Sequence, residues 1–191
     1  MEIWRLSITL KTGFHTTGTP RGAVVDVLRE EYLDKNLERR RRIIIPATHI
    51  KGVVRSEAER IWGRTDTILK LFGPGEQEGA ESYQEPLLRF TDAHAEEVPI
   101  LQRIHVRIDP STGSHVERGL YSEKFVPSGT VFTGYILSRA SLNDDERTIL
   151  EGSLISASHY GFGGSRSRGL GEVEVEFEPC DLQAFLDEVR G

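Results

Sequence analysis

At 191 residues and a formal net charge of −6, the chain fits one domain, and its acidity argues against indiscriminate binding to polyanions. A single cysteine, Cys180, excludes an internal disulfide framework and a cysteine-rich zinc site. No apolar run approaches the roughly 20 residues that span a bilayer, and the N-terminus lacks the pattern of a secretion signal, so we expect a cytoplasmic protein with no membrane association.

The first half of the chain predicts a strand, a loop, a polar segment and a helix. Residues 3–10 alternate as a strand does, and a glycine- and proline-rich loop follows them. The polar segment 23–42 has some helical character, and 43–46 is a short apolar strand that a proline stops. A helix then runs to about Trp62, because apolar residues recur at spacings of three and four, and Thr48 is positioned to cap it.

The second half predicts three more strands, a second long helix and an insertion. These elements are a strand at 87–93, a protruding β-hairpin at 98–128, a strand at 129–140, a helix from Asn143 or Asp144 to about 158, a strand at 170–178 and a short helix at 181–189. Without the insertions the order is β–α–β–β–α–β, which is typical of an α+β ferredoxin-like (RRM-like) fold with an antiparallel sheet and two helices on one face. We expect one such domain over residues 1–191, with 98–128 as its insertion.

Basic residues gather in local tracts on this acidic chain. Arg39, Arg40, Arg41 and Arg42 are consecutive, and Arg166 and Arg168 stand close together near the C-terminus. Such a distribution suits a protein that grips nucleic acid along one path. The alternative is a solvated surface on which charges cluster by chance.

The stretch GFGGSRSRGLG (161–171) combines five glycines with those two arginines. Glycines let backbone N–H groups approach a phosphate closely, and arginines add charge-assisted hydrogen bonds to its oxygens. The stretch has no Gly-Lys-Ser/Thr, and it follows a helix and opens a strand, which is the reverse of a dinucleotide-binding fold. It therefore predicts an anion-binding loop outside the known nucleotide motifs, with a plain flexible connection as the alternative.

A second candidate anion site lies in IPATHIKGVVRSEAERI (45–61). A strand end, a proline and a helix opening with Lys51 would bring backbone amides and one cation to a helix N-terminus. An ordinary amphipathic helix is the equal alternative.

Histidines and carboxylates give weaker indications. None of the six histidines shows the spacing of a metal site. Asp26 follows two valines just after a glycine-rich turn, where a carboxylate could reach a ligand, although a surface aspartate in a mobile segment fits the same spacing. Cys180 stands among acidic residues, where a thiolate is disfavoured.

Five motifs in order resemble the RAMP superfamily of CRISPR-associated proteins, in particular the backbone subunits of type III effector complexes. The matching segments are TGFHTTG (12–18), IPATHIKGVVRSEAE (45–59), LFG (71–73), the thumb-like hairpin and following strand at 103–132, and GGSRSRGLGEVEV (163–175). The resemblance covers nearly the whole chain.

The resemblance implies a ferredoxin-like subunit that repeats along a CRISPR RNA in antiviral defence, with other effector subunits and a complementary target RNA as partners. Each thumb would interrupt the guide–target duplex at a regular interval. The implied RNA-binding residues are His15, His49, Lys51, Arg55, Arg107, Arg118, Lys124, Gly163, Gly164, Ser165, Arg166 and Arg168.

In that family a single aspartate after the first strand cuts target RNA with a divalent metal, expected here to be Mg²⁺. By position the match is Asp26, with Asp34 as the fallback, because the segment from Asp26 to Ile45 is longer and more charged than the usual linker. A lone carboxylate could hold a metal or position the 2′-hydroxyl for attack on the adjacent phosphate.

Three other functions stay open. The chain could be a non-catalytic RNA-binding subunit of the same complex. It could also be a precursor CRISPR RNA endonuclease with His15 or His49 as general base, although those enzymes often carry two ferredoxin-like copies. A small-molecule phosphate binder that uses the glycine-rich loop is the last alternative.

Overall fold

The computed structural model describes residues 1–15, 24–25, 27–34, 36–74 and 85–190, and the side chains of 24, 25, 117, 118 and 188–190 are outside that description. Its main sheet has the strand order β10-β1-β9-β6-β4-β3, and β5 also pairs with β9. The strands are β1 (Glu2–Leu10), β3 (Arg29–Leu33), β4 (Arg39–Ile45), β5 (Leu88–Phe90), β6 (Ala93–Glu96), β9 (Val131–Ser138) and β10 (Val173–Pro179).

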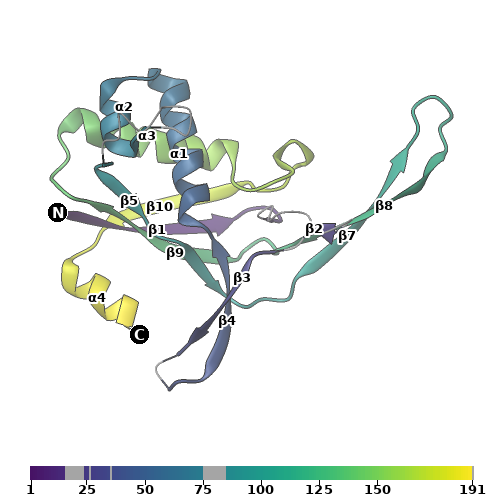
Figure 1. Cartoon of the computed structure of the whole chain (residues 1–191), viewed down its shortest axis with the longest axis horizontal. Helices are drawn as coiled ribbons and strands as arrows, with labels where there is room; N and C mark the ends of the chain where they lie inside the picture. The colour runs from purple at the N-terminus through teal and green to yellow at the C-terminus, as the bar shows by residue number, and fades with distance from the viewer. Residues whose placement is uncertain (16–23, 26, 35, 75–84, 191) are drawn as a thin grey trace.

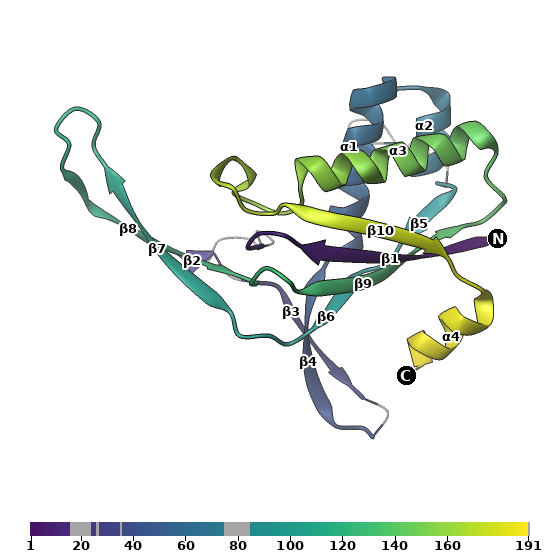
Figure 2. The same cartoon turned by 180° about the vertical axis from the view of Figure 1, so that it is seen from behind.

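Two long helices, α1 (Ala47–Trp62) and α3 (Asp144–Tyr160), and the short α2 (Asp66–Phe72) lie over one face of this sheet (Figures 1 and 2). The order β1, α1, β5–β6, β9, α3, β10 gives the sheet order 4-1-3-2, so the predicted ferredoxin-like fold is confirmed. Among the described residues, no helix is long and apolar enough to cross a membrane.

One buried core joins the sheet to the helices. Alternate residues of β1, including Leu6 and Ile8, face Ile50 and Val54 of α1 and Leu150 of α3 within a single cluster. The short helix α4 (Leu182–Arg190) lies across the sheet from α1 and α3 (Figure 2). There the ring of Phe185 meets Tyr135 of β9 edge-on.

The predicted thumb is present as a twisted ribbon that extends away from the body (Figure 1). It consists of β7 (Leu101–Ile108) and β8 (His115–Phe125), and the two-residue strand β2 (Val24–Val25) pairs with β8. Cross-strand partners such as His105 and Tyr121 are directly opposite each other, so their side chains share one face of the ribbon.

Two local predictions are wrong. The described residues of the segment 23–42 are not helical, because β3 and β4 form a hairpin in which glutamates of β3 pair with arginines of β4, while Ile43 and Ile45 are buried in the strand period. Thr48 does not cap α1: the N-cap is Pro46, and Asp92 from the β5–β6 connection accepts a 2.7 Å hydrogen bond from the N–H of Ala47.

Candidate nucleic-acid interface

The two predicted cationic turns lie against each other. The N–H of Gly163 donates a 2.9 Å hydrogen bond to Nε2 of His49 in the first turn of α1. The ring of Phe162 packs beside the same imidazole, with 6.2 Å between ring centroids. The glycine-rich loop also contacts the loop after β1, since Gly164 donates to the carbonyl of His15 at 3.1 Å.

Glycine is required where this loop passes the β1 loop. Gly163 has φ 82°, a left-handed conformation that side chains rarely adopt. A Cβ atom there would lie 2.5 Å from the carbonyl oxygen of His15 and 2.7 Å from the ring of Phe14. The loop therefore approaches the body more closely than any other residue type allows.

A groove runs along α1 beside the loop. Small side chains at Thr48, Gly52 and Ser56, each four residues apart, lie on one face of the helix. Together with His49, Val53, Glu57 and Arg166 they line a hollow of about 270 Å³. Among the described residues, no atom outside the adjacent backbone of α1 lies within 4 Å of the position that a Cβ on Gly52 would occupy, so this part of the helix is open to a ligand.

The cations near this groove are of two kinds. Arg166 is exposed and forms the rim, while Lys51 is half-buried, and burial and then Arg55 lower its pKa. Arg55 itself pairs with Glu59 at 2.7 Å. Burial, and then the charge of Arg166, also lower the pKa of His49, which agrees with a neutral ring that accepts the Gly163 hydrogen bond.

The amides at the start of α1 are partly engaged. Asp92 takes the N–H of Ala47, and the carbonyl of Pro46 takes the N–H groups of His49 and Ile50. An anion at the start of α1 would therefore be bound mainly by cationic side chains of the helix and less by its first backbone amides.

One buried carboxylate joins three segments at the base of the thumb. Glu123 of β8, 3% exposed, lies 2.7 Å from Nε2 of His15 and 3.2 Å from Nε2 of His105, and Ser165 of the glycine-rich loop donates to it at 2.6 Å. Burial alone would raise the pKa of Glu123, but the hydrogen bond from Ser165 and the contacts with His15 and His105 outweigh it and lower the pKa. Glu123 is therefore held as a carboxylate.

Arg168 extends the same cluster. Its guanidinium donates a 2.9 Å hydrogen bond to the hydroxyl of Tyr121, whose ring stacks on that of His105 with 4.8 Å between centroids. Sequence reasoning missed Glu123 and Tyr121 as site residues. The alternation of β7 and β8 in the predicted hairpin could have found them, since residues 121 and 123 share a face with 103 and 105.

The remaining predicted residues are spread along the thumb. Arg107 is exposed two positions beyond His105 toward the tip, where the register of the ribbon shifts, and Lys124 of β8 is on the opposite face from Glu123. Arg118 belongs to β8, but its side chain is outside the description. The structure thus brings together His15, His49 and the glycine-rich loop with Arg166 and Arg168, and separates them from Arg107.

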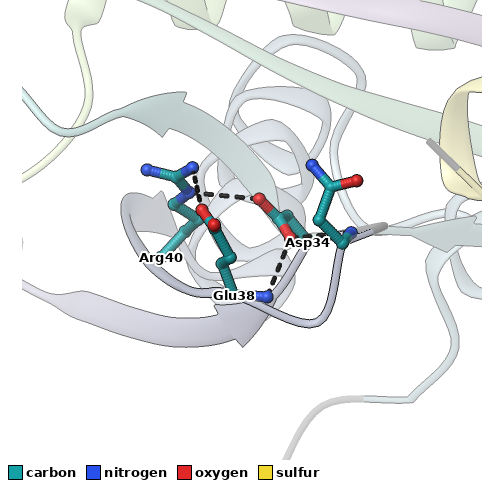
Figure 3. A network of polar contacts seen from close by, with 4 residues as sticks. Asp34, Glu38 and Arg40 are labelled. Carbon is teal, nitrogen blue, oxygen red and sulfur yellow. Dashed lines mark hydrogen bonds and ion pairs between the residues drawn. The ribbon is translucent and has the colours of Figure 1, made fainter.

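The catalytic prediction at Asp26 lies outside the described residues. Asp34, the fallback, closes the β3–β4 turn with both carboxylate oxygens: Oδ1 accepts from the N–H groups of Asn36 and Glu38, and Oδ2 from Arg40 (Figure 3). The described part of the chain contains no group of three or more His, Cys, Asp or Glu side chains arranged to hold a metal.

The positions of the two candidate general bases do not favour acid–base catalysis. His15 is 1% exposed and faces Glu123, and Nε2 of His49 is taken by Gly163. The arginine tract is largely neutralised as well, because Arg40, Arg41 and Arg42 pair with acidic residues of their own hairpin.

A family model described as the RAMP superfamily matches residues 8–174. Three solved structures are similar in fold. A chain of a type III-B Cmr-beta complex bound to cognate target RNA has a TM-score of 0.66 and 19% identity, over 94% of this chain and 61% of that chain. A chain of a type III-B Cmr-beta complex in its apo state has a TM-score of 0.65 and 14% identity, over 92% of this chain and 96% of that chain, and a chain of a type IV-B CRISPR complex has a TM-score of 0.68 and 12% identity, over 92% and 90% of the two chains. The chain thus spans less than two thirds of the first of these relatives. No curated protein matches the chain.

Proposed function

Because the chain belongs to the RAMP superfamily, we propose that it is a CRISPR RNA-binding backbone subunit of a type III effector complex, which assembles in copies along the guide. Similar folds in subunits of type III-B and type IV-B complexes support this proposal.

The observation that carries the proposal is the hydrogen bond between Gly163 and His49. This bond joins the two predicted anion-binding segments, the glycine-rich loop and the start of α1. Arg166 of the loop then lies at the rim of the groove along α1. A single RNA strand that follows this groove would place phosphates near Arg166 and Lys51 and pass over Gly52, where no side chain obstructs it.

Contacts of this kind carry no sequence information, as a guide-bearing protein requires. Arginines bind phosphate oxygens by charge-assisted hydrogen bonds, and backbone amides of a glycine-rich loop can add to them. The thumb would stand beside the same strand, since Glu123 ties its base to the glycine-rich loop through Ser165.

RNA binding is tested by titrating purified protein with a single-stranded RNA of unrelated sequence over a range of salt concentrations. Each phosphate contact contributes about 0.7 to the slope of log K against log salt for a single strand. Arg166→Ala should weaken binding and reduce that slope, whereas Arg139→Ala, which removes an exposed arginine paired with Glu85, should not. Equal slopes for the two variants would contradict the proposed path of the strand.

We further propose that the subunit cuts bound target RNA through Asp26 with Mg²⁺. The described residues do not by themselves form a metal site, so this proposal rests on the resemblance around Asp26. In the assembled complex Asp26→Ala should abolish target cleavage while target binding persists. Asp34→Ala, which also opens a turn, tests the fallback assignment in the same assay. If both variants cleave as the wild type does, the subunit is a non-catalytic scaffold.

A further inference from the structure

The tip of the β3–β4 hairpin displays a strained leucine. Leu37 has φ 60°, in the left-handed region where a leucine costs roughly 1 kcal/mol and where glycine or asparagine is usual. Its side chain is 78% exposed, so burial in this chain does not offset that cost. A turn that had only to close the hairpin would not need leucine at this position.

A network of hydrogen bonds holds the tip in this conformation (Figure 3). The carboxylate of Asp34 accepts from the N–H groups of Asn36 and Glu38, each at 2.9 Å, and the N–H of Leu37 donates to the carbonyl of Asp34 at 2.9 Å. Arg40 adds a 3.1 Å hydrogen bond from its Nε to Asp34. The exposed leucine is thus presented on an ordered support.

The surroundings of Leu37 combine apolar and positive character. Leu33, also near the tip, is 59% exposed. Arg40 and Arg41 are neutralised by acidic residues of the hairpin, whereas the exposed Arg39 has no ion-pair partner in the described part of the chain. The tip therefore offers two exposed leucines and the exposed cation of Arg39.

A complementary hollow lies elsewhere on the molecule, where β1 begins and β10 ends. Its volume is about 390 Å³, and its lining is mainly apolar: Met1, Ile3, Trp4, Pro179 and Leu182 with Glu2, Arg147, Cys180 and Asp181. Met1 is 66% and Leu182 50% exposed. Among its charged lining residues, Arg147 pairs with Glu2, so the exposed carboxyl group of Asp181 makes the rim acidic.

We infer that the tip of the β3–β4 hairpin of one copy docks into this hollow of the next copy, with Leu37 inserted and Arg39 facing the acidic rim. Because the inserted element and the receiving hollow are different surfaces, the contact is heterologous and can continue from copy to copy. The inference rests on the proposed function, since a backbone of repeated copies needs such a contact.

The single native cysteine makes the contact directly testable, because Cys180 lines the receiving hollow. In RNA-free protein, Leu37→Cys treated with a short bis-maleimide should give a ladder of cross-linked multimers. The ladder should be lost in Leu37→Cys/Cys180→Ser. It should also be absent from Ser111→Cys, which carries the new thiol in the thumb turn instead.

Three results would overturn the inference. The first is an absence of multimers with Leu37→Cys, and the second is a dimer that persists in the double variant, which would place two hairpins against each other. The third is cross-linking to a different subunit when the full complex is used. Because the cross-linking of the isolated protein is done without RNA, a negative result there does not bear on RNA binding, which the salt titration tests separately.

Discussion

Ser165 of the glycine-rich loop donates a 2.6 Å hydrogen bond to Glu123 at the base of the thumb, although 42 residues separate them in the chain. The same carboxylate faces His15 and His105. One buried charged group therefore contributes to the orientation of the thumb relative to the proposed RNA path, together with the hydrogen bond from Arg168 to Tyr121. A carboxylate in this position is stable only while its partners remain in place.

Glu123→Ala should lower the free energy of unfolding by about 1–3 kcal/mol, because it leaves Ser165 without its buried acceptor and removes the carboxylate that lies 2.7 Å from His15. Urea unfolding measures the change. Glu176→Ala, on the exposed side of β10, is the control and should stay within about 0.5 kcal/mol of the wild type. A Glu123→Ala protein as stable as the control would show that the junction contributes nothing to folding.

The pH dependence of stability should report on His49. Its pKa is lowered in the folded state below the ordinary 6.5 by burial and by Arg166, so its contribution is complete above pH 6.5. As the pH falls below 6.5, the unfolded chain takes up a proton that the folded protein resists, and stability declines until the folded-state pKa is passed.

His49→Gln keeps an acceptor for Gly163 but cannot titrate, so it should lose less stability than the wild type over the same acid range. The free energies of unfolding of the two proteins are compared by denaturant unfolding at about one pH unit above and one below 6.5. If the two proteins lose the same amount of stability in this acid range, groups other than His49 cause the pH dependence.

The fold was predictable because its main elements carry strong periodic patterns. The two-residue alternation of β1 and the spacing of Ile50, Val54 and Ala58 in α1 match the buried faces in the structure. The β3–β4 hairpin was not predictable in this way, since most of it is exposed. Its arginines and glutamates compensate each other across the strands, a pairing that depends on register rather than on local sequence.

The site was predictable only in part. Arg166, Arg168 and His49 could be identified from the glycine-rich loop and from the start of the helix. Two contacts join residues far apart in sequence: Asp92 accepts from the first N–H of α1, and Glu123 faces His15. No local motif indicates either contact. The expected role of Asp26 stays a prediction, because that residue is outside the described part of the chain.

Asp92→Ala should lower stability by about 1 kcal/mol, because it removes the acceptor for the first N–H of α1. It should also strengthen binding of phosphate-containing ligands at the start of the helix, since a carboxylate would no longer occupy that end of the helix dipole. Thermal unfolding and RNA titration measure the two effects. Asp66→Ala, in the first turn of α2, is the control for loss of a carboxylate at a helix start away from the groove.

Gly52 allows stability and RNA binding to be changed in opposite directions. It lies within α1 with open space above it, so Gly52→Ala should raise the free energy of unfolding by about 0.5–1 kcal/mol through helix propensity alone. Gly52→Gln should keep most of that gain, yet its long side chain would extend into the groove beside Arg166 and Ser56. RNA affinity should therefore fall for Gly52→Gln and change little for Gly52→Ala. Because Gln adds no charge, the salt dependence should stay that of the wild type, which separates steric obstruction from the loss of a phosphate contact. If Gly52→Gln binds RNA as tightly as Gly52→Ala does, the strand does not pass over this face of α1.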